Sequence, residues 1–126
     1  MQRLTAESCD PKELNMLALA FVGDGVYDLI VREKLVCEGN CRVKELNARK
    51  VEQVRCQAQA QRAAKIEPIL TPEEADILRR GRNAHVSHAP KNATTADYHM
   101  ATALECLVGY LYLSDRLDRI IELMEY

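Results

Sequence analysis

The stretch Ala18-Leu19-Ala20-Phe21-Val22-Gly23-Asp24-Gly25-Val26-Tyr27-Asp28-Leu29-Ile30-Val31 is strongly apolar, yet it contains two carboxylates and two glycines. In a helix, residues three and four positions apart are neighbours, so one face contains Leu17, Phe21, Asp24, Asp28 and Val31. Asp24 then lies in the middle of an apolar stripe. A buried carboxylate is costly unless it is paired, protonated or bound to a metal. Asp24 therefore needs a partner from elsewhere in the chain.

The composition favours an all-helical fold. The 126 residues are 48% hydrophobic and 29% charged, with five Gly and four Pro, and Ala and Leu are frequent. This length suits one domain with its own core, so we expect residues 1–126 to form a single domain. No apolar run reaches the ~18 residues that span a bilayer, and residues 1–7 lack a signal-peptide pattern. We expect a cytoplasmic protein that is not associated with a membrane.

The cysteines and histidines do not predict a disulfide framework or a zinc site. Five cysteines with irregular spacing indicate free thiols in a reducing compartment. Cys37 and Cys41 are four positions apart, but no second pair completes a tetrahedral site. His85 and His88, with only His99 as a third candidate, are interpreted as structural or solvated side chains.

Basic residues are concentrated in two segments, although the net charge is only −2. Residues 40–65 contain seven basic and two acidic side chains, and residues 79–99 contain four basic and one acidic. This separation fits a basic face beside an acidic pocket, and it also fits ordinary solvated helix surfaces.

Capping signals divide the chain into five helical segments. Asp10-Pro11 with Glu13, and Thr71-Pro72 with Glu74, are typical helix starts. The expected segments run from Pro11 to Val36 (continuous or bent at Gly23–Gly25), over 42–65, from Pro72 to about Arg82, from Thr94 or Thr95 through Tyr112, and over 116–126. Residues 83–94 form the expected long loop.

A second acid, Glu105, also falls on an apolar helical face, with Gly109 beside it. Two carboxylates on apolar helices, each with a glycine that permits close packing, could meet around one cation, and Mg²⁺ prefers such oxygen ligands. Asp24 and Glu105 are the predicted ligands. Asp28, one turn beyond Asp24, is a further ligand or a supporting acceptor. An ion pair with a basic neighbour such as Arg32 is the equally open alternative for these acids.

Four segments carry a resemblance to a known family. Phe21-Val22-Gly23-Asp24-Gly25-Val26 resembles the signature of the ribonuclease III endonuclease domain, and residues 103–113 resemble its second acidic motif. Arg80-Gly81-Arg82-Asn83-Ala84 and Pro90-Lys91-Asn92-Ala93 resemble the Mini-ribonuclease III subgroup, which lacks a double-stranded-RNA-binding domain. The likeness extends over nearly the whole chain.

The resemblance implies an all-helical catalytic domain of about five to seven helices that forms a homodimer and cleaves double-stranded RNA. Asp24 and Glu105 would be catalytic ligands of Mg²⁺, for which Mn²⁺ can substitute, and the product ends would be 5′-phosphate and 3′-hydroxyl. The subgroup is associated with maturation of large-subunit (23S) ribosomal RNA, so precursor ribosomal RNA, with a ribosomal protein on it, is the expected partner. The wider family has further acids at the positions of Ala20 and Thr102, which implies a reduced site here.

Without a separate RNA-binding domain, the basic residues of 42–65 and 79–91 must hold the duplex, through phosphates and 2′-hydroxyls. The loop 83–94 is expected to approach the RNA, and Phe21, Val22 and Val26 to serve the dimer interface. The predicted RNA-binding residues are Arg79, Arg80, Arg82, Asn83, Lys91 and Asn92. The alternative is a non-catalytic helical module that binds RNA or a protein, which would keep the basic face without needing both acids.

Overall fold

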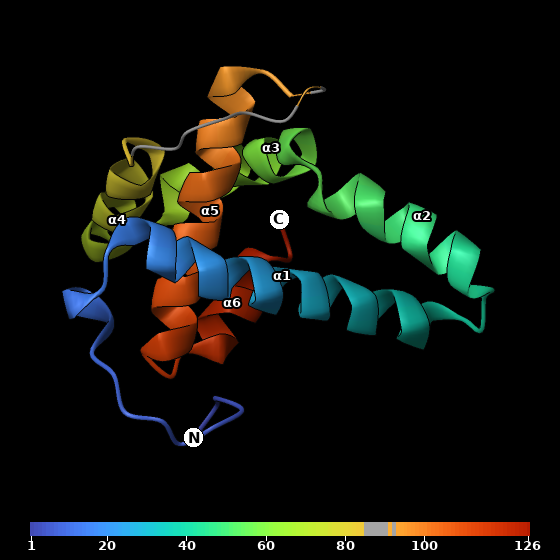
Figure 1. Cartoon of the computed structure of the whole chain (residues 1–126), viewed down its shortest axis with the longest axis horizontal. Helices are drawn as coiled ribbons and strands as arrows, with labels where there is room; N and C mark the ends of the chain where they lie inside the picture. The colour runs from blue at the N-terminus through green and yellow to red at the C-terminus, as the bar shows by residue number, and fades with distance from the viewer. Residues whose placement is uncertain (85–90, 92) are drawn as a thin grey trace.

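The computed structural model describes residues 1–84, 91 and 93–126. These residues form six α-helices and two short 3-10 helices, with no strand among them (Figure 1). The elements are η1 (Pro11–Glu13), α1 (Met16–Glu38), α2 (Val43–Val54), α3 (Cys56–Ile66), η2 (Glu67–Ile69), α4 (Pro72–Arg82), α5 (Thr95–Leu113) and α6 (Leu117–Leu123). The predicted all-helical class is confirmed.

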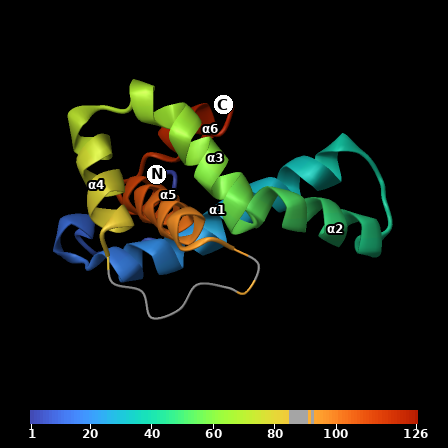
Figure 2. The ribbon, with the colours of Figure 1, turned by 90° about the horizontal axis from the view of Figure 1, so that it is seen from above.

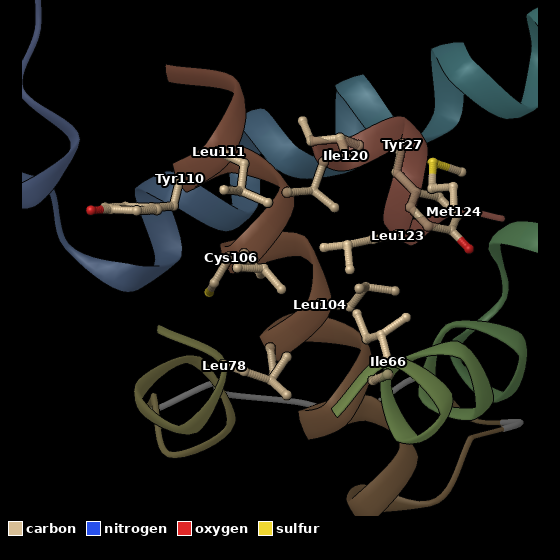
Figure 3. Packing of buried hydrophobic residues seen from close by; sticks show 14 of the residues in the cluster. Tyr27, Ile66, Leu78, Leu104, Cys106, Tyr110, Leu111, Ile120, Leu123 and Met124 are labelled. Carbon is tan, nitrogen blue, oxygen red and sulfur yellow. The ribbon is translucent and has the colours of Figure 1, made fainter. Parts of the chain in front are cut away.

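Helix α5 is the centre of the fold. It is apolar on all sides, which suits a helix that is covered by others, and ten of its residues are buried. Figure 2 shows it almost end-on, with α1, α3 and α4 around it. Leu104 and Leu111 of α5 share one buried cluster with side chains from four other helices (Figure 3), among them Tyr27, Ile66, Leu78 and Ile120.

Helix α1 crosses α5, and its C-terminal half extends away from the body with α2 returning beside it (Figures 1 and 2). It runs without interruption through Gly23 and Gly25, so of the two forms expected for it the continuous one is present. It ends at Glu38, two residues beyond the expected end at Val36, and Gly39 follows as its C-cap.

The start of the first helix differs from the prediction. Asp10 accepts a hydrogen bond from the Lys12 backbone N–H at 3.0 Å, but it caps only the single turn η1. The chain is extended at Leu14, and the N-cap of α1 is Asn15, whose side chain accepts from the Ala18 N–H at 2.8 Å. Asp10 and Asn15, five positions apart, are both good capping residues, and the long helix uses the second.

The single helix predicted over 42–65 is also wrong. Arg55 has an extended backbone (ψ 155°), which separates α2 from α3. The Gln59 carboxamide donates to the carbonyl oxygen of Val54 at 2.8 Å. A side chain therefore satisfies a carbonyl group at the break, where a helix end would otherwise leave it free.

The starts of α4 and α5 are confirmed. Thr71 and Glu74 form a reciprocal capping box, and Thr94 accepts from the Asp97 N–H at 3.0 Å. Glu74 is 1% exposed and pairs with Arg119 of α6, at 2.8 Å between Oε2 and Nε, which joins α4 to α6. For the expected loop, residues 85–90 and 92, with His85 and His88, lie outside the described part of the chain.

Two further expectations can be compared with the structure. All five cysteines are free. Within the described residues, no helix combines the length and the hydrophobicity required to cross a membrane.

Candidate active site

Two glycines allow α1 and α5 to cross with their backbones in contact. A Cβ atom added to Gly23 would lie 1.8 Å from the Glu105 carbonyl oxygen, and one added to Gly109 would lie 1.9 Å from the Leu19 carbonyl oxygen. Only glycine fits at either position. The close packing expected of a glycine beside Asp24 is confirmed for Gly23. Gly25, on the other side of Asp24, has no such role, since an added Cβ there has no atom within 4 Å.

The sequence pattern places Asp24 within a buried apolar face of its helix, but in the structure that face is not the buried one. Asp24 is exposed in the protomer, as are Leu17 (43%) and Phe21 (83%) on its face. The face of α1 that enters the core contains Leu19, Ala20, Gly23, Tyr27, Ile30, Val31 and Leu35. Because this helix is apolar nearly all round, its periodicity could not indicate which face is buried.

Glu105 is the half-buried acid, and it meets Asp24 across the helix crossing. Burial, together with a hydrogen bond to the Asp24 carboxyl and the charge of that group, raises the pKa of Glu105 to about 8, and a hydrogen bond from Gln59 acts in the opposite direction. Two carboxyl groups this close cannot both be ionised without cost. The pair therefore requires either a shared proton or a cation.

The pair fits Mg²⁺. Mg²⁺ in proteins is held by one or two carboxylates and keeps several waters, and Asp24 supplies an exposed carboxylate that leaves room for them. Gln59 adds a buried carbonyl oxygen, Oε1, that has no hydrogen-bond partner. In the described part of the chain, no set of three or more His, Cys, Asp or Glu side chains is arranged to hold a metal, so the protein would provide two carboxylates and water the remaining ligands.

The other acid of the opening stretch is already paired. Asp28 forms ion pairs with Arg32, at 2.5 Å, and with Lys50 of α2, at 3.6 Å. This is the alternative that the sequence left open. The two positions at which the resemblance implies further acids supply none: Ala20 is buried, and the Thr102 hydroxyl donates to the Tyr98 carbonyl oxygen at 3.0 Å.

Four of the six candidate RNA-binding residues lie at the C-terminal end of α4. Arg79, Arg80, Arg82 and Asn83 are exposed at the C-terminal end of α4, and Lys91 is exposed further along the chain, while Asn92 lies outside the described residues. Arg79 and Arg80 also pair with Asp76, at 2.6 and 3.9 Å.

Some of the basic residues predicted to hold RNA in segment 40–65 have internal partners. Arg49 pairs with Glu38 at 2.6 Å, and Arg62 donates to the Met124 carbonyl oxygen at 2.5 Å. Arg42, Lys44, Arg55 and Lys65 are exposed and remain suited to phosphate contacts.

Sequence reasoning missed two residues of this region. Gly81 is the penultimate residue of α4, close to the expected helix end, and its packing role has no signal in the sequence: an added Cβ there would be 2.9 Å from Cys106 Sγ. Gln59 was assigned no role, and it contacts Glu105. A glutamine within an Ala-rich helical pattern carries no local signal of such a contact.

Comparison with known proteins places this geometry in a family. The ribonuclease III domain model matches residues 17–116. The Mini-ribonuclease 3 of Symbiobacterium thermophilum is 41% identical over 116 residues, which cover 92% of this chain and 89% of that protein. The Mini-ribonuclease 3 of Gloeobacter violaceus is 45% identical over 109 residues, 86% of this chain and 78% of that protein.

A solved structure has the same fold. The crystal structure of a Fusobacterium nucleatum protein superposes with a TM-score of 0.86 at 28% identity and covers 94% of both chains. Family membership removes the alternative of a non-catalytic helical module. The chain belongs to the ribonuclease III family, in its Mini-ribonuclease III group, and is an endoribonuclease.

Proposed function

We propose that this protein is a Mg²⁺-dependent endoribonuclease that hydrolyses double-stranded RNA, with Asp24 and Glu105 as catalytic metal ligands and residues 1–126 as one catalytic domain. The observation that carries the proposal is the meeting of these two carboxyl groups at the Gly23–Gly109 crossing. A structural acid pair would be expected to have a basic partner, as Asp28 has in Arg32 and Lys50.

Asp24 and Glu105 have different roles in the proposed site. Asp24 is exposed and can accept a cation next to an RNA phosphate, whereas Glu105 is fixed on the central helix. When bound, Mg²⁺ lowers the pKa of a coordinated water and neutralises charge that develops on the phosphate. We expect cleavage to leave 5′-phosphate and 3′-hydroxyl ends, and Mn²⁺ to substitute for Mg²⁺.

We propose that the RNA duplex is held by the exposed basic residues of α2 and α3 together with the end of α4. A-form RNA is recognised through its phosphates and 2′-hydroxyls, and guanidinium and ammonium groups suit these contacts. Helices α3 and α4 lie on two sides of α5 (Figure 2), so their basic side chains flank the helix that carries Glu105. The expected RNA contacts include Arg79, Arg80, Arg82, Asn83, Lys91 and Asn92.

The exposed apolar face of α1 supports a homodimer. Phe21 is 83% exposed, and Leu17 and Leu29 are 43% and 52% exposed, which is unusual for side chains of this size on one helix. Val22 and Val26, also expected at the interface, are half-buried, and Val26 packs on the core. A two-fold dimer would present two identical sites, one for each RNA strand.

For the biological role, we propose maturation of 23S ribosomal RNA in the cytoplasm. The substrate would be precursor ribosomal RNA, with a ribosomal protein on it as a further partner. The proposal follows from the resemblance to the Mini-ribonuclease III group, to which the chain belongs.

The test is incubation of the purified protein with duplex and single-stranded RNA, with Mg²⁺ and with EDTA. We expect cleavage of the duplex only, and only with Mg²⁺. Asp24→Asn should lose at least about 1,000-fold in rate, because a metal ion supplies several kcal/mol of transition-state stabilisation. Asp118→Asn, a matched change of an exposed acid on α6, should cleave normally. Unchanged cutting by Asp24→Asn would reject this site.

A further inference from the structure

Gln59 joins three elements around the proposed site. It lies in α3 shortly after the break at Arg55 and is only 3% exposed. Its Nε2 donates to the Val54 carbonyl oxygen at 2.8 Å, and the side chain lies close enough to the Glu105 carboxyl to lower the pKa of that group. One carboxamide group thus connects the end of α2, the start of α3 and the acid on α5. The two N–H bonds of Nε2 are sufficient for both contacts.

The oxygen of the same carboxamide has no partner. Among the described residues, Oε1 is the only buried side-chain nitrogen or oxygen that lacks a hydrogen bond. Such a group costs about 1–3 kcal/mol if it stays unsatisfied, so its presence in a native protein indicates a water or an ion. Because Oε1 and Nε2 are bonded to the same carbon, this oxygen also lies beside Glu105.

We propose that Gln59 is a positioning residue of the active site, which holds the Glu105 carboxylate toward Asp24 and offers Oε1 to a water of the bound cation. The inference rests on the proposed metal-dependent nuclease function. Mg²⁺ keeps several of its waters, and each water is a donor that needs an acceptor.

A neutral amide suits this position better than a charged or an apolar side chain. Lysine or arginine would neutralise the carboxylates and compete with the cation. An apolar residue would leave both Glu105 and the Val54 carbonyl without their donor. Glutamine supplies two donors and one acceptor and adds no charge.

The test measures Mn²⁺ binding to the RNA-free protein by titration calorimetry, together with duplex cleavage across a Mg²⁺ series. Gln59→Met keeps the shape and removes the polar groups, and we expect about 10-fold or more weaker Mn²⁺ binding. The kcat should fall, and rise again at high Mg²⁺, while KM for RNA stays constant because Gln59 is buried. Gln57→Met, an exposed glutamine on the same helix, should match the native protein.

A second variant keeps the inference testable if Gln59→Met does not fold. Gln59→Glu retains the size and adds a third carboxylate, so we expect tighter Mn²⁺ binding and a lower kcat. Folding is verified by circular dichroism. If both folded Gln59 variants bind Mn²⁺ as the native protein does, Gln59 supports only the α2–α3 break and the inference is overturned.

The same titration of Asp24→Asn separates the role of Gln59 from the existence of the proposed metal site. Loss of Mn²⁺ binding in Asp24→Asn, with native binding in Gln59→Met, rejects the role of Gln59 and leaves the metal site intact. A native protein that binds no Mn²⁺ and cuts no duplex overturns the proposed function and this inference together.

Discussion

Gly23→Ala should damage the fold and the active site together. The added Cβ would lie 1.8 Å from the Glu105 carbonyl oxygen, whereas ordinary contacts begin at 3.4 Å. The obstacle is backbone on a central helix, so no side-chain rotation can relieve it. Helices α1 and α5 must therefore separate by about 1.6 Å at the crossing.

Overpacking of this kind typically costs about 1–3 kcal/mol. A contact that is about 1.6 Å too short should cost an amount at the upper end of this range. Alanine recovers about 1 kcal/mol through its higher helix propensity. The net loss in the free energy of unfolding should therefore be about 2 kcal/mol. Because Asp24 and Glu105 lie on the two separating helices, activity should fall further, by about 100-fold for a displacement of roughly 1 Å.

The assay pairs urea unfolding with single-turnover cleavage of duplex RNA. Gly25→Ala is the matched control, since an added Cβ there meets no atom within 4 Å in the protomer. Its free energy of unfolding should rise by up to about 1 kcal/mol. The two variants are compared at equal dimer fraction, which sedimentation measures. Native stability and native activity in Gly23→Ala would refute the reasoning from the crossing.

Two other acids lead to predictions with opposite signs. Arg119→Met leaves Glu74 buried without its partner and should lower the free energy of unfolding by about 3 kcal/mol in a urea titration. Burial alone would raise the pKa of Glu74, but hydrogen bonds from Arg119 and from the Thr71 N–H lower it overall. The stability that Glu74 contributes should therefore be fully present above about pH 4.3, its pKa in the unfolded chain. It should be lost as the pH falls through the lower pKa of Glu74 in the folded protein. Acid unfolding curves test this. Glu105→Gln should abolish Mn²⁺ binding yet stabilise the metal-free protein at pH 7, because burial and Asp24 raise the pKa of Glu105 to about 8. That gain should shrink as the pH falls toward about 4.3 and vanish below it, where the carboxyl is protonated in both the folded and the unfolded states. A constant gain would contradict the explanation.

Local signals predicted the parts of the fold that depend on a few neighbouring residues. The Thr71–Glu74 capping box and the Thr94 cap need only residues three positions apart, so the starts of α4 and α5 could be predicted. The acids of the proposed site could be singled out because a carboxylate within an apolar helix is conspicuous in any sequence. Gly23 and Gly109 were conspicuous because a glycine weakens the interior of an apolar helix and therefore indicates close packing.

The features that could not be predicted depend on distant contacts. The residues around Arg55 include no Gly or Pro that would mark a break. The Val54 carbonyl at the break is satisfied by Gln59, which in turn reaches Glu105 on α5. Exposure of Asp24 likewise follows from how α1 lies on α5, since the periodicity of an apolar helix leaves its buried face undecided.

The reduced acid set gives these distant contacts particular weight. Where the resemblance implies further carboxylates, Ala20 is in the core and the Thr102 hydroxyl is bonded to the Tyr98 carbonyl oxygen. A site with more carboxylates could lose the exact placement of one and still hold a cation. With Asp24 and Glu105 alone, the proposed cation site would depend on the distance between two helices, which Gly23 and Gly109 set, and on the orientation of Glu105, which we assign to Gln59. Changes at these uncharged residues should therefore weaken metal binding measurably, although less than changes of the acids themselves.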